Sequence, residues 1–348
     1  MREINRLLWD SFPEGLIQVS GGLVADCNPM ARHYLPQLQP GAPLPDCLAL
    51  PASSPSGAGI FSTQLSCYTF SRTVSESEQL ILFRPAPQSA LTDLQLDGAL
   101  RQMRAFLGEL MGQIAPQTGG ERRPLAGAGL SKSFHRMFRL VSNLDYMRAS
   151  AAQEGVPFRP VTMDLAGLCR QLAQDAGGLL ARAGTQLAYE SDTLSVLISG
   201  DPQLLQKLLL ELISNSVRAA PGGRIVLQLR RLGNRALLVC SDSGAPLGER
   251  ELASMLQQDS DQNLPLPGQG AGLGLPIARH IVSLHQGTLL VEWGGGAPSV
   301  LVSLPAGRPE PRVSVQTPPP CRDGGLSPLM VELSDVLPAE LFGLEGLD

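Results

Sequence analysis

The sequence Gly268-Gln-Gly-Ala-Gly-Leu-Gly-Leu275 leads directly into the run from Pro276 to His285, and this junction decides the fold. Glycines at this density let the backbone wrap around an anion. A helix over Pro276 to His285 would offer a phosphate its unpaired N–H groups and positive dipole end. The polar stretch before it, Gln257 to Asn263, is interpreted as a mobile lid, whereas a dinucleotide-binding loop should follow the first strand of a βαβ unit. We therefore predict a phosphate-binding loop.

Closer to the N-terminus, Asp242-Ser-Gly244-Ala-Pro246 follows a predicted strand over Ala236 to Ser241. An ionised carboxylate only accepts hydrogen bonds, so Asp242 suits the exocyclic amine of adenine. Gly244 would let the backbone turn close to the ring. Taken alone, an Asp-Ser-Gly sequence favours an ordinary surface turn.

A helix predicted over Pro202 to Ala220 carries Glu211, Asn215 and Arg218. Glu211 and Asn215 are four residues apart and share one side of that helix. The Asn215 amide oxygen suits Mg²⁺, the Glu211 carboxylate could polarise water or a hydroxyl, and Arg218 could meet a phosphate. Taken alone, such residues are usually the solvated face of an amphipathic helix.

Together, in this order and at separations of roughly thirty residues, the three motifs resemble the N, G1 and G2 boxes of the family of histidine kinases, gyrase, Hsp90 and MutL. The resemblance covers most of Asp201 to Pro305. The run from Gly272 to Glu292 and the ending Val300-Leu-Val-Ser-Leu-Pro305 are closest to the histidine-kinase form.

This resemblance implies a Bergerat ATP-binding fold over 157–307, with ATP and Mg²⁺ as cofactors. The order of predicted helices and strands there independently favours a two-layer α/β sandwich. The resemblance implies Asn215 as the Mg²⁺ ligand, Asp242 as the adenine reader and Glu211 as a basic catalyst. The expected nucleotide-binding set is completed by Arg218, Gly244, Gly270, Gly272 and Gly274, of which the last three would form the lid hinge.

Two apolar seams at helical spacing predict an antiparallel helical hairpin over 89–150. They are Leu96, Leu100, Met103, Leu107, Leu110 and Ile114, then Leu130, Phe134, Met137, Val141 and Leu144. Two copies paired in a four-helix bundle would bury both seams, which predicts a homodimer. Alternatively, the hairpin packs on its own neighbouring domains. Its excess of arginine is interpreted as a solvated face.

A histidine kinase needs a phosphoacceptor histidine on the first hairpin helix, because neutral imidazole is the nucleophile. The best match to the family's His-Glu-Leu is Gly108-Glu109-Leu110, and glycine accepts no phosphate. Only His135 lies in the hairpin, on the second helix, and Arg136 follows it where an acid would be needed. We expect a structural or surface role for His135.

The ends of the chain add two blocks. Pro13-Glu-Gly-Leu-Ile-Gln-Val and Leu23-Val-Ala-Asp-Cys-Asn-Pro-Met-Ala resemble the opening of a PAS sensor domain, predicted over 1–88, although an unrelated small α+β domain is an alternative. Residues 308–348 are interpreted as a proline-rich linker and an acidic tail, in which Leu326 to Leu347 could dock as a short helix.

Composition fits a multidomain α+β protein. The chain has 348 residues, 43% of them hydrophobic, and a net charge of −5, which gives no general attraction to nucleic acid. Its six cysteines form no C-x-x-C pair, and no segment reads as a signal peptide or a membrane span, so we expect a cytoplasmic protein.

Three functions remain in view. The first is a dimeric, PAS-linked, histidine-kinase-like protein that binds Mg-ATP for two-component signalling, with its usual phosphoacceptor missing. The second is a non-catalytic pseudokinase scaffold that regulates a partner kinase or response regulator. The third is a serine kinase of the anti-sigma branch, which lacks a helical hairpin and is therefore disfavoured.

Overall fold

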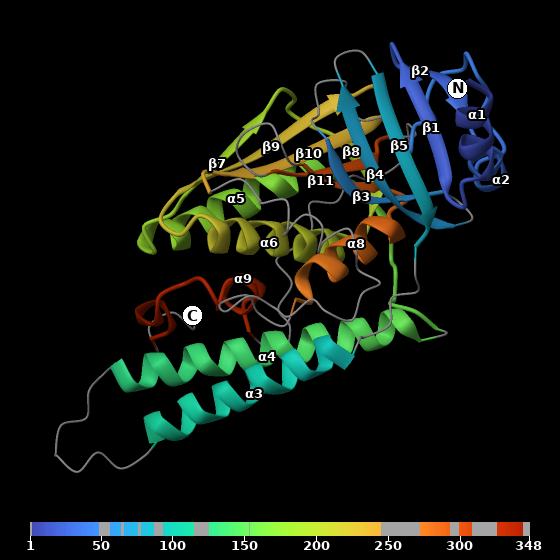
Figure 1. The fold of residues 1–348 in the computed structure, drawn as a ribbon. Helices are drawn as coiled ribbons and strands as arrows, with labels where there is room; N and C mark the ends of the chain where they lie inside the picture. The colour runs from blue at the N-terminus through green and yellow to red at the C-terminus, as the bar shows by residue number, and fades with distance from the viewer. Residues whose placement is uncertain are drawn as a thin grey trace.

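The computed structural model describes residues 2–48, 56–63, 66–75, 78–86, 93–114, 125–152, 154–244, 272–292, 299–307 and 326–343. Within them the chain forms a mixed α+β structure in layers, with a long sheet, helices beneath one of its faces and a helical hairpin beneath those (Figure 1). The expected lid over Gln257 to Asn263, Pro246, Gly270 and most of the linker lie outside the described residues.

The N-terminal unit is a five-stranded antiparallel sheet with two helices. Its elements are α1 (Arg2–Ser11), β1 (Gly15–Ser20), β2 (Leu23–Cys27), α2 (Pro29–Tyr34), β3 (Gly57–Ser62), β4 (Cys67–Ser75) and β5 (Glu78–Pro85). Asn28 caps α2 as expected, because its Oδ1 accepts the N–H of Ala31 at 2.8 Å. The same atom accepts the N–H of Leu16 at 2.9 Å, which ties the helix to β1.

The C-terminal unit begins after the hairpin. Its elements are β6 (Val161–Asp164), α5 (Leu165–Arg182), β7 (Gln186–Ser191), β8 (Leu197–Gly200), α6 (Pro202–Ala219), β9 (Arg224–Leu232), β10 (Arg235–Asp242), α8 (Gly274–Leu284), β11 (Thr288–Glu292) and β12 (Ser299–Pro305). Helices α5, α6 and α8 cover one face of the sheet, as the two-layer prediction requires (Figure 1). Strands β6 and β8 form a separate pair, and β7 runs parallel to β9.

The two units share one ten-stranded sheet, in the order β2-β1-β5-β4-β3-β11-β12-β10-β9-β7. The junction is the antiparallel pair β3–β11, in which Phe61 lies opposite Thr288. A Cβ on Gly59 would collide with the carbonyl oxygen of Leu289, so the close approach of the strands depends on glycine there. Strand β3 belongs to the predicted N-terminal domain and β11 to the predicted ATP-binding domain, so this pair joins two domains that the sequence analysis treats separately.

Helices α3 (Asp93–Ile114) and α4 (Leu125–Ala151) form the hairpin. Four of its buried apolar side chains belong to the same core as the C-terminal unit, namely those of Ala99, Phe106, Leu140 and Met147. The predicted seams are instead largely open. Their exposed members are Leu96, Leu100, Leu107, Leu130, Phe134 and Val141. These six side chains form an apolar face open to solvent, whereas Met103, Met137 and Leu144 of the seams pack against the core.

The C-terminal segment docks as a short helix, as expected. Helix α9 (Pro328–Glu332) and the 3₁₀ turn η1 (Ala339–Phe342) contact α4, and α9 also contacts α6 (Figure 1). The prediction of a solvated basic face on the hairpin was wrong for Arg139, which is 4% exposed and pairs with acids of α6 and of this segment. No described helix is long and apolar enough to cross a membrane.

Candidate functional site

The three predicted motifs meet on helix α6. Asp201 fixes where this helix begins, because its carboxylate accepts the N–H groups of Gln203 and Leu204. Pro202 follows at the first helical position, where a missing N–H costs nothing. One side of α6 is buried against α8 and the sheet, which brings the end of β10 and the start of α8 to neighbouring turns.

Asp242 lies at the end of β10, with 7% of its surface exposed. Its Oδ1 accepts the N–H of Gly244 at 2.9 Å, and the hydroxyl of Ser216 on α6 lies 3.4 Å from Sγ of Cys240 on the same strand. Burial raises the pKa of Asp242, and the Gly244 N–H and the Ser216 hydroxyl only partly offset this rise. A Cβ on Gly244 would lie 2.9 Å from the carbonyl oxygen of Ala219, so the turn after β10 lies directly against the end of α6.

The described part of the glycine run begins at Gly272, whose φ of +68° lies in the left-handed region that glycine adopts readily. Two residues later Gly274 opens α8 against α6. A Cβ on Gly274 would lie 2.6 Å from Oε2 of Glu211 and 3.6 Å from Nδ2 of Asn215. The start of α8 therefore touches both polar residues that the sequence places on one side of α6.

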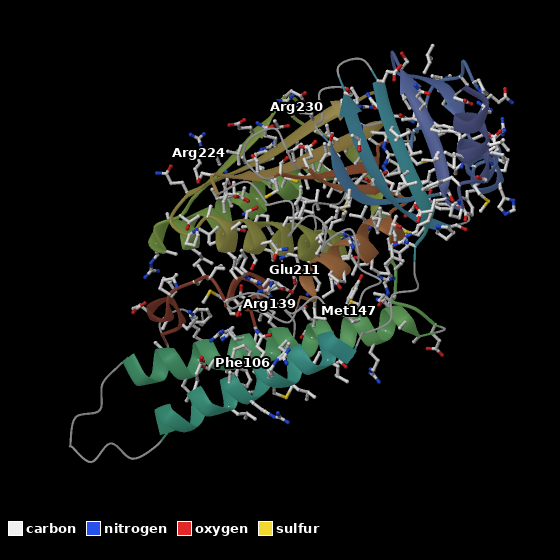
Figure 2. The ribbon with its side chains drawn as sticks, viewed as in Figure 1. Phe106, Arg139, Met147, Glu211, Arg224 and Arg230 are labelled. Carbon is white, nitrogen blue, oxygen red and sulfur yellow. The ribbon has the colours of Figure 1, made fainter. Side chains whose placement is uncertain are left out.

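Glu211 is completely buried and paired with the hairpin. Its Oε2 accepts a hydrogen bond from Nη2 of Arg139 at 2.8 Å, and its Oε1 accepts one from Nδ2 of Asn143 at 3.2 Å. Figure 2 shows Glu211 and Arg139 facing each other between α6 and α4. The carboxylate expected to act on water is thus held by two donors from α4.

Arg218 bonds to its own helix and to the C-terminal segment. Its Nη2 donates to Oγ of Ser214 at 3.1 Å and to Oδ2 of Asp335 at 3.3 Å. The guanidinium expected to meet a phosphate therefore faces the C-terminal segment. Asn215 is half-buried and lies on α6 one residue before Ser216, whose hydroxyl is paired with Cys240 of β10.

Sequence reasoning missed Ser216, Arg139 and Asn143. The first had no signal beyond its place next to Asn215. Arg139 and Asn143 are four residues apart on α4, and such a polar pair within an apolar helix signals a partner facing it. The partner is Glu211, 72 residues from Arg139 in the chain.

These residues fit the cofactors that the motifs imply. Asp242 is fixed by the hydrogen bond from Gly244, and its carboxylate offers an acceptor to an amine donor. Asn215 carries a neutral amide oxygen of the type that Mg²⁺ accepts, and its Nδ2 would lie 3.6 Å from a Cβ on Gly274. Among the described residues no group of three or more His, Cys, Asp and Glu side chains could hold a metal ion.

The comparisons with known proteins cover the segment that carries these residues. The model of the histidine kinase-, DNA gyrase B- and HSP90-like ATPases matches residues 200–308. Sensor histidine kinase CusS of Escherichia coli K12 is 25% identical over 174 residues, which are 49% of this chain and 36% of CusS. Circadian input-output histidine kinase CikA of Synechococcus elongatus is 36% identical over 95 residues, which are 26% of this chain and 13% of CikA.

Among solved structures, the histidine kinase ThkA in complex with the response regulator protein TrrA aligns with a TM-score of 0.47 and 12% identity, over 85% of this chain and 97% of that one. The aligned parts of CusS and CikA are well under half of those proteins. Residues 200–308 therefore form a domain of the histidine kinase-, DNA gyrase B- and HSP90-like ATPase type, and CusS and CikA, to which the chain is similar, are histidine kinases.

Proposed function

We propose that this chain is a cytoplasmic, dimeric signalling protein of the histidine-kinase type, which binds Mg-ATP between α6, the end of β10 and the start of α8. The observation that carries the proposal is the convergence of three motifs on one helix. The turn from Asp242 to Gly244 lies against the end of α6, and Gly274 lies against Glu211 and Asn215. Structural residues at random surface positions would not be expected to meet in this way.

In this proposal Asp242 accepts the adenine amine, Asn215 holds Mg²⁺ and the glycine run with the start of α8 holds phosphate. ATP supplies a transferable phosphoryl group when it is bound. Glu211 keeps α6 joined to α4, because its carboxylate is shared between Arg139 and Asn143. Glu211 then acts as a basic catalyst only in a state in which α4 has moved away.

The dimer is proposed to form through the open face of the hairpin. Leu96, Leu100 and Leu107 on α3 are exposed at spacings of four and seven residues, and Leu130, Phe134 and Val141 repeat those spacings on α4. Two parallel stripes of this kind on neighbouring helices are suited to a four-helix bundle. The N-terminal sheet unit is proposed to be a PAS-like sensor, and a response regulator or a partner kinase to be the target.

A second candidate is a scaffold that binds nucleotide without transferring phosphate. Two observations favour it. Gly108 stands where the phosphoacceptor is expected, and His135 is buried with 5% of its surface exposed. The hairpin therefore offers no exposed histidine within its described residues.

Calorimetry and labelling of the purified full chain test both candidates. Titration with ATP in the presence and absence of Mg²⁺ should show binding that is tighter with the metal, and absence of binding in both would contradict the ATP site. Radiolabelled ATP then separates the activities. Acid-labile label on the chain indicates phosphohistidine, acid-stable label on a partner protein indicates a serine kinase, and binding without label indicates the scaffold.

A further inference from the structure

The C-terminal segment 326–343 lies between α4 and α6, in a space bordered by both helices (Figure 1). Its apolar side chains belong to the main core, where Leu333 and Leu337 are completely buried. At its far end Phe342 packs its ring against His135 of α4, with ring centroids 5.1 Å apart. The segment is therefore bound along its length and contacts the hairpin at more than one place.

Two acids of this segment meet four cations of the two helices. Glu332 accepts hydrogen bonds from Nε of Arg139 at 3.0 Å and from Nζ of Lys207. Asp335 accepts from Nε of Arg136 at 3.0 Å, from Nη1 of Arg139 at 2.9 Å and from Nη2 of Arg218 at 3.3 Å.

The cations need these acids because they lie close to one another. Burial lowers the pKa of Arg218 most, and the nearby charge of Arg139 lowers it further, which is the effect expected of crowded positive groups. Burial opposes the charge of Asp335 and Glu332 as well, yet both pKa values fall below their ordinary values because the cations outweigh it. Charged hydrogen bonds in a buried place are strong and directional.

The basic site is shared between two structural units. Arg136 and Arg139 come from α4, whereas Lys207 and Arg218 come from α6. A ligand that binds all four cations therefore holds the hairpin against the helices of the C-terminal unit. It also keeps Arg139 on Glu211, because Nη2 of Arg139 bonds to Glu211 while Nε and Nη1 bond to the segment.

We propose that residues 326–343 are an intramolecular ligand of the basic site formed by Arg136, Arg139, Lys207 and Arg218, and that they hold α4 against α6. Release of the segment frees the two units to separate and frees Glu211 from Arg139. The proposal rests on the ion pairs and the buried apolar contacts, and it holds whether or not the site on α6 binds nucleotide.

A cleavable full-length chain tests the proposal. A recognition sequence for a specific protease is placed within 308–325, the chain is folded intact and then cut, and retention of the segment is measured by gel filtration. The unaltered segment should stay bound at micromolar protein. With Glu332→Gln and Asp335→Asn together, the dissociation constant of the cut segment should rise by roughly tenfold or more, because hydrogen bonds between two charged groups are stronger than those that involve a neutral partner.

Glu340→Gln is the matched control, because Glu340 lies in the same segment but is exposed and forms none of these ion pairs. It should be retained like the unaltered segment. If the double variant does not fold, Asp335→Asn alone gives the same comparison with a smaller expected effect. Loss of the unaltered segment on cutting, or equal retention of the double variant, would overturn the proposal.

Mixing two mass-labelled copies before cutting tests whether the ligand is intramolecular. After cutting, each segment should remain bound to the chain from which it was cut. A segment retained on the other labelled chain would show that the basic site binds the tail of a second copy, which would also overturn the proposal as stated. Since the readout is retention of the segment, failure here leaves the proposed nucleotide site untouched.

Discussion

Gly274 lies so close to Glu211 that a Cβ on the glycine would stand 2.6 Å from Oε2 of the carboxylate. The same carboxylate is fixed from the other side by Arg139. A side chain at position 274 must therefore displace either the start of α8 or the pair Glu211–Arg139. This contact links the glycine run to the hairpin through a single buried residue of α6.

Gly274→Ala should weaken Mg-ATP binding and lower the stability of the chain. Forcing a methyl group into a packed site costs about 1–3 kcal/mol, so we expect a fall in the melting temperature together with a weaker calorimetric affinity. Gly178→Ala in α5 is the control, since its Cβ would meet nothing within 4 Å and alanine favours helix. An affinity unchanged in Gly274→Ala would mean that this contact is not part of the site.

Asp242→Asn should reduce nucleotide affinity by roughly ten- to a hundredfold, because a hydrogen bond to a charged group contributes about 1.5–3 kcal/mol. The amide places a donor where the adenine amine needs an acceptor. Asp192→Asn, at an exposed acid of the same unit, should bind nucleotide like the unaltered chain.

Asn215→Ala should weaken the binding of Mg-ATP more than the binding of metal-free ATP. Calorimetry that finds both site variants unchanged would exclude this site.

Local patterns predicted local structure well. The Asn28 cap, the hairpin of β1 and β2, the helix of residues 202–219 and the docking of the tail all follow from capping residues, glycine turns and apolar spacing. These signals operate over a few residues, so a single sequence contains them.

Contacts between distant segments were not predictable in the same way. The pairing of β3 with β11 depends on glycines at 57 and 59, which alone indicate only a weak strand. The buried position of Arg139 depends on acids 72 and 193 residues further along the chain. Sequence spacing gives each helix its face but does not state what that face meets.

Leu107→Glu should prevent dimerisation of the full chain. Leu107 is 48% exposed in the single chain, so a charge there costs little until the face is buried by a partner, when an unpaired carboxylate becomes costly. Sedimentation at micromolar protein should give a monomer. Leu194→Glu, at a leucine that is 87% exposed in the ATPase unit, should remain dimeric. If both variants sediment alike, the hairpin is not the interface.

Because His285 is buried in its neutral form, the C-terminal unit should lose stability as the pH falls below about 6.5, the ordinary pKa of histidine. Its Nε2 accepts the N–H of Asp201 at 3.0 Å while its Nδ1 donates to the carbonyl of Ile281 at 2.7 Å, so the ring is neutral. Burial lowers the pKa of His285, and the interactions with Ile281 and Asp201 raise it only in part. Below the pKa that His285 has in the unfolded chain, the unfolded chain binds more protons than the folded chain. The free energy of unfolding therefore decreases as the pH falls.

Urea unfolding of the full chain between pH 7.5 and 5.5 measures this effect. His285→Gln keeps a hydrogen-bonding side chain that takes no proton, so its stability should fall less steeply over this range. His33→Gln, at an exposed histidine of the N-terminal unit, should follow the unaltered chain. Equal slopes in all three proteins would show that His285 does not couple protonation to folding.

His135 should carry no phosphate after incubation of the isolated chain with Mg-ATP. Its Nδ1 bonds to the carbonyl oxygen of Ser131 at 2.8 Å, and Phe342 packs on its ring. Only 5% of the residue is exposed, which leaves no path for a γ-phosphoryl group, and Arg136 after it supplies no base. Mass spectrometry at neutral pH, which preserves phosphohistidine, should find the peptide unmodified. Phosphate on His135 that disappears in His135→Gln would instead establish a kinase whose acceptor lies on the second hairpin helix.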